Sequence, residues 1–203
     1  MTPRSYSQHR RATSSAKTKR RIRQAALDLY RERGITRTTI SGIAERADVS
    51  RGTVLNHYGN AEQLLNHLLD EIVVELGYPD ERVMEGAASE PERVRRYVDA
   101  MFRFFVRSEE HWPSFAGSLD HPVARAREEE FYSVVGRLYA ATFLDLASDR
   151  VVEAAARAYV NYSPLNDLRA AGLTLDEAIE VVSNTLIDLV ARRRGELAMP
   201  VAQ

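Results

Sequence analysis

A short polar segment in the first third of the chain carries side chains suited to binding a nucleic acid. Arg51, Thr53, Asn56 and His57 stand within one run of seven residues. Side chains of these types hydrogen-bond phosphate oxygens or base edges, and Asn pairs bidentately with adenine. Gly52 lets the backbone approach a phosphate closely, because it has no Cβ. This combination favours DNA recognition over catalysis.

Two short helices separated by a tight turn are expected to position these side chains. Apolar residues at helical spacing predict a first helix over 40–47, with Thr39 as its N-cap. Asp48 occupies the turn, because Asp tolerates a left-handed backbone better than most residues. Ser50 is the expected N-cap of a second helix over 51–57. Contacts expected for a steep helix-turn-helix crossing involve Ala44, Val49 and Val54.

The charge of the chain is strongly asymmetric, although its net value is only −1. Residues 1–60 contain 13 Lys and Arg against 4 Asp and Glu, whereas residues 61–203 are acidic. A basic block of this strength indicates nucleic acid or an anionic membrane surface as its partner. The absence of cysteine excludes disulfides and thiolate catalysis, and no apolar run approaches the ~20 residues that span a bilayer. We therefore expect a cytoplasmic protein without a membrane partner.

The rest of the chain shows helical periodicity and no strand alternation, which predicts an all-α fold. Gly34 stands where a C-terminal helix cap belongs, and Pro164 predicts a kink or break. The expected helices run over 15–33, 60–76, 89–105, 122–147, 150–172 and 174–194.

Residues 20–65 combine small residues and terminal aromatic residues at fixed spacing. The residues concerned are Arg23–Leu27, Gly34, Thr38–Thr39, Ile43–Ala44, Ala47, Val49–Thr53, His57–Tyr58 and Leu64–Leu65. In these residues the segment resembles the N-terminal domain of the TetR family of transcriptional regulators. The resemblance implies a three-helix helix-turn-helix DNA-binding domain followed by a helical ligand-binding and dimerisation bundle. We accordingly expect a flexible basic arm at 1–14, the DNA-binding domain at 15–62, and the ligand-binding and dimerisation domain at 63–203.

The same resemblance implies roles for individual residues in the DNA-binding domain. Thr53 and Asn56 would face the bases. Two positions depart from the family pattern, since Leu55 replaces an aromatic residue, usually Tyr, and Ala61 replaces a Lys. Each lost backbone contact is expected to lower DNA affinity and flatten its salt dependence. The residues expected to contact phosphates are Thr39, Ser50, Arg51, Gly52 and His57.

The basic arm offers a compensating contact with DNA. Its cations would reach phosphates or an adjacent minor groove, so that deletion of residues 1–16 weakens operator binding. The alternative is a solvated tail without a partner. The cations concerned are Arg4, Arg10, Arg11, Lys17, Lys19, Arg20 and Arg21.

The family resemblance also implies a small-molecule effector bound inside the C-terminal bundle. Aromatic side chains suit the lining of an apolar cavity, whereas ordinary core packing is the alternative for each of them. Tyr97 and His111 are the candidate polar anchors of an apolar or aromatic effector. The candidate ligand-binding residues are Tyr97, Met101, Phe104, His111, Trp112, Phe115 and Tyr132.

Broad apolar faces on the last two predicted helices indicate a second subunit. The resemblance implies a four-helix interface between two copies, and a two-fold homodimer suits a palindromic operator with half-sites about 34–36 Å apart. The candidate interface residues are Ala155, Tyr159, Val182, Leu186 and Leu189.

The leading hypothesis is a ligand-responsive transcriptional repressor that leaves its double-stranded DNA operator when a small molecule binds. The alternative is a TetR-like helical interaction protein that has lost specific DNA reading, as Leu55 and Ala61 permit. His111 and His121 lie near acidic residues, but no HExxH or EF-hand spacing occurs. No catalytic nucleophile–base pair is apparent, so we expect no enzyme activity, metal or cofactor.

Overall fold

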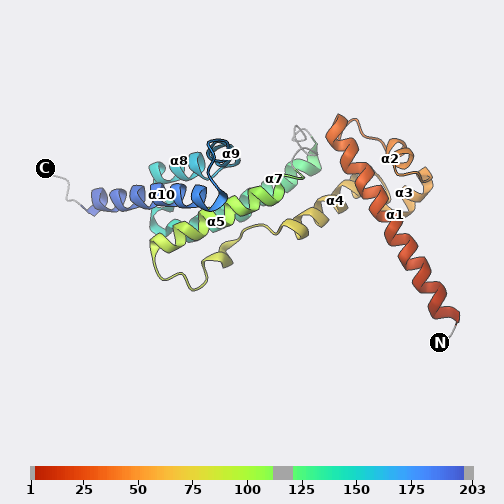
Figure 1. Ribbon diagram of the computed structural model, residues 1–203, viewed down its shortest axis with the longest axis horizontal. Helices are drawn as coiled ribbons and strands as arrows, with labels where there is room; N and C mark the ends of the chain where they lie inside the picture. The colour runs from red at the N-terminus through yellow and green to blue at the C-terminus, as the bar shows by residue number, and fades with distance from the viewer. Residues whose placement is uncertain (1–2, 112–120, 199–203) are drawn as a thin grey trace. The chain divides into compact units, whose positions relative to one another are not determined.

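The computed structural model describes residues 3–111 and 121–198, and all of its regular elements in these ranges are helices. This confirms the predicted all-α fold. The chain forms two compact units (Figure 1), of which the first comprises Met1–Glu75 and Glu109–Glu129 and the second Leu76–Ser108 and Glu130–Gln203. None of the described helices combines the length and apolar character needed to cross a membrane.

The first unit contains four helices at the N-terminal end of the chain, together with Glu109–Glu129. The helices are α1 (Pro3–Arg33), α2 (Ile40–Arg46), α3 (Arg51–Tyr58) and α4 (Ala61–Leu76). α2 packs against both α1 and α3. Apolar residues at helical spacing give each helix one buried face, which explains why these short segments fold together. The core of the unit includes Ile22, Ala26, Leu29, Ile43, Val54, Leu64, Leu65 and Leu68.

α1 is longer than the sequence pattern predicts, because it begins at Pro3 instead of Ser15. Proline is well placed at the first position of a helix, where its missing N–H has no intrahelical partner. No glycine or second proline interrupts the chain before Gly34. Gly34 then ends the helix at φ +82° and donates its N–H to the carbonyl of Tyr30, as expected for a C-terminal cap.

The second unit is a bundle around α5 and α10. Its elements are η1 (Glu81–Met84), α5 (Glu90–Ser108), the part of α7 (Pro122–Phe143) that follows Glu129, η3 (Leu144–Ser148), α8 (Arg150–Tyr159), α9 (Tyr162–Ala170) and α10 (Leu175–Ala198). α10 packs along α5 and also contacts α8 and α9. The core between these helices includes Val94, Val98, Phe102, Leu138, Phe143, Val152, Leu165 and Leu186.

Two predicted helices are shorter than expected. α7 ends at Phe143 rather than 147, because Leu144 takes a left-handed φ of +51° and a 3-10 turn follows. The helix predicted over 150–172 is divided, since Val160 and Asn161 separate α8 from α9. Pro164 lies in the first turn of α9, where no N–H is needed, so the break precedes it.

Two adjacent arginines fasten the end of α10 to the rest of its unit. Arg193 binds the carboxylate of Asp149, the N-cap of α8, at 2.7 Å. Arg194 binds Glu90 at the start of α5 and Asp145 in η3, with nitrogen–oxygen distances of 2.5 and 2.9 Å. Each planar guanidinium forms several hydrogen bonds to its carboxylates. Such pairs hold α10 in one register more specifically than a lysine, which binds as a point charge, would.

Candidate nucleic-acid interface

The structure places the predicted caps and turn at the α2–α3 junction. Oγ1 of Thr39 accepts a hydrogen bond from the N–H of Gly42 at 3.1 Å, and Oγ of Ser50 accepts one from Thr53 at 3.0 Å. Asp48 adopts the left-handed region at φ +50° between the two helices. Local polar groups therefore define both helix starts and the turn, in agreement with the sequence prediction.

α3 is held in place by its apolar face. Val54 is fully buried and Tyr58 nearly so, and they belong to the same core as Ile43 and Ala44 of α2. The N–H of Val49 also donates to the carbonyl of Ala44 at 3.0 Å, which closes the turn. Because these residues fill the inner side of α3, its remaining positions point away from the core.

The outer side of α3 presents hydrogen-bonding groups that have no partner within the described chain. Arg51 and Asn56 are exposed and His57 is half-buried, and none of the three forms a hydrogen bond or ion pair there. A Cβ built on Gly52 would meet only Oγ of Ser50, at an ordinary distance of 3.7 Å. The protein itself therefore does not require glycine here, and the space above it is open.

The remaining predicted DNA contacts have a structural role as well. The hydroxyls of Ser50 and Thr53 share a hydrogen bond of 2.8 Å, so that the cap of α3 also orients the Thr53 side chain. Thr39 likewise caps α2 through its hydroxyl oxygen. A hydroxyl that accepts a backbone N–H still has its own proton to donate, so capping is compatible with a phosphate contact.

Several basic residues of this unit are occupied by internal partners. Arg21 contacts Asp48, and Arg46 forms a bidentate pair with Glu32, with both distances 2.8 Å. The Arg46 pair holds the pKa of the Glu32 carboxyl below its usual range, chiefly through the hydrogen bonds. Arg23 binds two carboxylates of α4, those of Glu71 and Glu75. Charge counting along the sequence misses these roles, because each pair joins residues at least fourteen apart.

One glycine of the junction lies against a side chain of α1. At Gly42 on α2, an added Cβ would meet the guanidinium of Arg33, near the end of α1. The contacting atom is the far end of a flexible side chain, so a shift of Arg33 would make room for a small side chain at residue 42.

The two departures from the family pattern lie at the edge of this surface. Leu55 is half-buried on α3, and Ala61 is exposed as the first residue of α4. Oδ1 of Asn60 accepts the N–H of Gln63 at 2.8 Å, so α4 has a capped start. Neither departure disturbs the local fold, and the exposed position of Ala61 leaves space for a longer side chain.

The structure gathers only part of the predicted effector site. Tyr97, Met101 and Phe104 are buried side by side on α5 in the second unit, whereas Tyr132 on α7 is 62% exposed. His111 belongs to the first unit, where its ring nitrogen lies 3.7 Å from a carboxylate oxygen of Glu75. The other two candidates, Trp112 and Phe115, lie outside the described residues.

An aromatic residue that the candidate list omits lies next to Tyr97. The centroid of the Tyr139 ring lies 4.8 Å from that of Phe143 and 6.4 Å from that of Tyr97. Its hydroxyl is buried without a hydrogen-bond partner in the described structure, and burial raises its pKa to about 12. An unpaired buried hydroxyl is costly, so this group is suited to a polar atom of a bound molecule. Periodicity alone could not distinguish it from ordinary core.

The predicted dimer residues fall into two groups. Tyr159 is 45% exposed on α8, and Ala155 and Leu189 are half-buried at the surface. Val182 and Leu186, by contrast, are buried in the core of their own unit, and their place at a subunit interface stays a prediction. The apolar stripe of α10 packs against α5. The large apolar residues that are exposed on α8 and α10 are Val151, Tyr159 and Val181.

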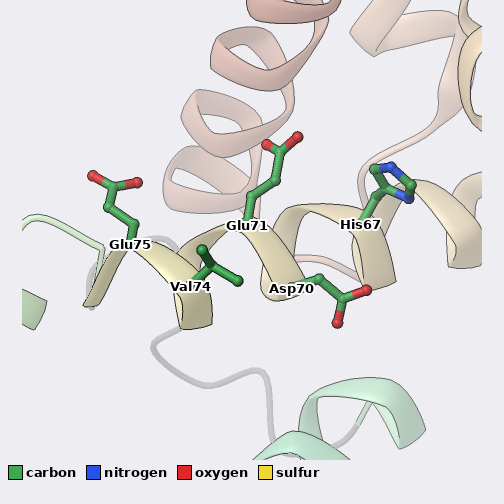
Figure 2. A pocket seen from close by; sticks show the side chains of 5 residues that line it. All are labelled: His67, Asp70, Glu71, Val74 and Glu75. Carbon is green, nitrogen blue, oxygen red and sulfur yellow. The ribbon is translucent and has the colours of Figure 1, made fainter. Parts of the chain in front are cut away.

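A shallow hollow of about 340 Å³ runs along α4 in the first unit, and its lining side chains project from that one helix (Figure 2). Its carboxylates already have partners, since Arg127 binds Asp70 and Arg23 binds both glutamates. The described residues gather no cluster of three His, Asp or Glu side chains able to hold a metal ion. The lining residues are His67, Asp70, Glu71, Val74 and Glu75.

Comparison with known proteins identifies a matching family and several similar proteins. Residues 22–68 match the family described as bacterial regulatory proteins, tetR family. The HTH-type transcriptional repressor Rv3405c of Mycobacterium tuberculosis is 44% identical over 55 residues, which cover 27% of this chain and 29% of that protein. The HTH-type transcriptional regulator BetI 1 of Chromohalobacter salexigens is 32% identical over 85 residues, which cover 41% of this chain and 42% of that protein.

A solved structure extends the similarity beyond the N-terminal helices. The fold resembles that of native NalD, the secondary repressor of the MexAB-OprM multidrug efflux pump in Pseudomonas aeruginosa, with a TM-score of 0.55. The two chains are 23% identical, and the alignment covers 88% of this chain and 96% of the other. The curated relatives, in contrast, are matched over less than half of their length. Sequence similarity thus concentrates in the α1–α4 unit, and the second unit shares the fold.

Proposed function

We propose, from the premise that this chain belongs to the tetR family of bacterial regulatory proteins, that it is a transcriptional regulator which binds a double-stranded DNA operator. The observation that carries this proposal is the outer side of α3. Arg51, Asn56 and His57 offer hydrogen-bond donors without internal partners, while Val54 and Tyr58 anchor the opposite side of the helix. A short, anchored helix with an unpaired polar face is suited to the major groove.

The proposed DNA contacts are of two kinds. Contacts with base edges read the sequence, and contacts with phosphates position the protein on the DNA. Thr53 and Asn56 would read base edges, since a threonine hydroxyl and an asparagine amide form specific hydrogen bonds there. The phosphate group would comprise the two cap hydroxyls, the open backbone at Gly52, and the side chains of Arg51 and His57. The residues proposed to contact phosphates are Thr39, Ser50, Arg51, Gly52 and His57.

A small apolar or aromatic effector would bind in the second unit and release the operator. The buried side chains of Tyr97, Met101 and Phe104 would form the apolar part of this site, and the unpaired hydroxyl of Tyr139 would be its polar anchor. The effector lowers DNA affinity by the difference between its affinities for the two conformations. The names of the M. tuberculosis relative and of NalD describe repressors, which favours repression over activation.

A homodimer would present two helix-turn-helix domains to a palindromic operator. Val151 and Tyr159 on α8 and Val181 on α10 leave apolar surface exposed, as an interface with a second copy requires. Ala155 and Leu189 would lie in the same contact. Such a regulator acts where the DNA is, so we place it in the cytoplasm, without enzymatic activity, cofactor or membrane partner.

The decisive experiment is selection of binding sites from a random-sequence DNA pool with the full chain. Enrichment of a palindrome with half-sites one helical turn apart supports the regulator. The variant Asn56→Ala is then expected to lose discrimination at one base position by about 1–3 kcal/mol. Uniform weak binding of all sequences would instead support the alternative, a helical interaction protein that has lost specific DNA reading.

A further inference from the structure

A second hollow, of about 490 Å³, lies within the second unit and is open to solvent. Its walls come from η1, α5 and α10. None of its lining residues belongs to the proposed effector site or to the surface of α3. The lining side chains that bear on its chemistry are Val83, Arg95, Ile179, Glu180, Ser183 and Asn184.

Two arginines of α5 hold the walls of this hollow together. Arg96 donates a hydrogen bond of 3.1 Å to the carbonyl oxygen of Val83, which ties η1 to α5. Arg103 pairs with Asp99 on its own helix and with Asp176 at the start of α10, and both distances are 2.7 Å. Because the protein's own contacts fix the three walls, a ligand that enters the hollow loses little affinity to reorganisation of the protein.

Other polar side chains of the hollow have no partner within the described chain. Arg95, Glu180 and Asn184 are exposed and form no hydrogen bond or ion pair there. Ser183 differs from them, because the residue is only 1% exposed and its hydroxyl is buried without a hydrogen-bond partner. Buried polar groups in native structures are normally paired, so an unpaired one needs an explanation. A ligand bound in the hollow beside Ser183 would supply the missing partner.

The free cation and the free anion of the hollow lie at different levels along its length. α5 and α10 run antiparallel, because the start of each helix is paired with a residue near the end of the other. With this register, Glu180 is level with an α5 residue about five positions after Arg95, which corresponds to roughly 8 Å at about 1.5 Å per residue. The pairs that define the register are Arg103–Asp176 and Arg194–Glu90.

We propose that this hollow binds a small zwitterion, whose carboxylate pairs with Arg95 and whose ammonium group pairs with Glu180. The inference goes beyond the proposed function, because it concerns a site outside both the DNA-binding surface and the effector site. A simple anion would be repelled by the unpaired carboxylate of Glu180, and a simple cation would be repelled by Arg95. A molecule that carries both charges is attracted at both levels.

The remaining lining groups fit the rest of such a molecule. A guanidinium binds a carboxylate through two parallel hydrogen bonds. On the α10 wall, the amide of Asn184 and the hydroxyl of Ser183 are further donors for carboxylate oxygens. Val83 and Ile179 add apolar surface for a methylene chain between the two charges. These features favour an unbranched ω-amino acid over an α-amino acid, in which both charged groups are attached to the same carbon.

Unbranched ω-amino acids of three to eight carbons are suitable probes, and isothermal titration calorimetry with the full chain in the absence of DNA measures their affinity. We expect the affinity to pass through a maximum at an intermediate chain length, because the separation of the charges must match the two levels. The alkylamine and the alkyl carboxylate of that length each lack one charge. Each should bind about three- to tenfold more weakly than the ω-amino acid, as the loss of one charged contact predicts.

Neutralising one charge of the hollow should affect only one end of the ligand. Arg95→Gln should weaken binding of the ω-amino acid and of the alkyl carboxylate, but not of the alkylamine. Glu180→Gln should weaken binding of the ω-amino acid and of the alkylamine, but not of the alkyl carboxylate. Arg150→Gln on α8 and Asp167→Asn on α9 are matched controls, because each removes an exposed charge that has no partner in the described ranges and does not line the hollow.

Both controls should bind the ω-amino acid like the parent, and far-UV circular dichroism establishes that every variant is folded. The zwitterion site is refuted if no member of the series binds at millimolar concentration, or if the singly charged analogues bind as tightly as the ω-amino acid. It is also refuted if the control variants weaken binding as much as Arg95→Gln and Glu180→Gln do. Because no DNA is present, these results do not depend on operator selection, so a failure here leaves the proposed function intact.

Discussion

Arg21 on α1 is joined to Asp48 in the turn between α2 and α3 by two hydrogen bonds of 2.7 and 2.8 Å. One of them goes to the backbone carbonyl of a residue that has a left-handed φ of +50°. The contact links the long N-terminal helix to the turn that sets the direction of α3. A residue that charge counting assigns to DNA thus serves to position the reading helix.

The Arg21–Asp48 contact should matter more for geometry than for stability. Both side chains are largely exposed, at 41% and 97%, so Arg21→Gln and Asp48→Asn should each cost less than about 1 kcal/mol. Asp48→Val should cost about 1–2 kcal/mol more, because a β-branched residue is strained at positive φ. Urea unfolding measures the three values. Equal losses for Asp48→Asn and Asp48→Val would show that the left-handed turn is unimportant.

Truncation of two apolar residues of α10 should change the unfolding free energy by very different amounts. Leu186 is fully buried, so Leu186→Ala should destabilise the second unit by about 2–5 kcal/mol. Val181 is 46% exposed, and Val181→Ala should change the unfolding free energy by less than about 0.5 kcal/mol. Chemical denaturation monitored by circular dichroism compares them. A small effect at Leu186 would contradict its position in the core.

If the exposed residue Val181 of α10 lies in the proposed dimer interface, a charge there should prevent dimerisation. Val181→Asp should give monomers in sedimentation velocity at concentrations where the parent is a dimer, because an unpaired charge would be buried between the subunits. Its circular dichroism spectrum should remain that of the parent. The matched change Glu180→Asp, on the same helix, should leave the dimer intact. A persistent dimer in Val181→Asp would remove α10 from the interface.

Restoring the two atypical positions of the DNA-binding unit should strengthen operator binding. Ala61 is exposed at the start of α4, so Ala61→Lys adds a flexible cation without disturbing the core. Each new phosphate contact should steepen the slope of log K against log salt by about 0.9. Leu55→Tyr should raise affinity with little change in that slope, since a phenol carries no charge. Fluorescence anisotropy with the selected operator provides both quantities.

The Asp149–Arg193 pair should make stability fall in acid. Hydrogen bonds from Arg193 and from the start of α8 lower the pKa of Asp149 from 3.8 to about 2. A lowered folded-state pKa gives stability that is complete above about pH 4 and disappears as the pH falls through about 2. Asp149→Asn should therefore be less stable than the parent at neutral pH and approach it near pH 2. Urea midpoints between pH 2 and 6 test this convergence.

The buried hydroxyl of Tyr139 offers a test of the effector site. Tyr139→Phe removes a polar group that has no partner in the described structure, so stability should be unchanged or rise by up to about 1 kcal/mol. The same change should weaken release of the operator by an effector that carries a polar group. A clear loss of stability would show that the hydroxyl is already hydrogen-bonded. An unchanged effector response would place the anchor elsewhere.

The sequence by itself determined the local features of this protein. The caps at Thr39 and Ser50, the left-handed turn at Asp48 and the end of α1 at Gly34 depend on groups within four residues of one another. Such short-range hydrogen bonds and steric limits are set by residue type and order. The helix-turn-helix and its exposed donors could therefore be predicted.

Only the tertiary structure decided which side of each helix is covered and by what. Leu186 and Val181 are both apolar and lie on one helix, yet one is buried against α5 and the other is exposed. Arg21 and Asp48 are 27 residues apart, so nothing in the local sequence pairs them. Periodicity identifies an apolar or basic face, but the partner of that face depends on how distant segments pack, which chain order alone does not specify.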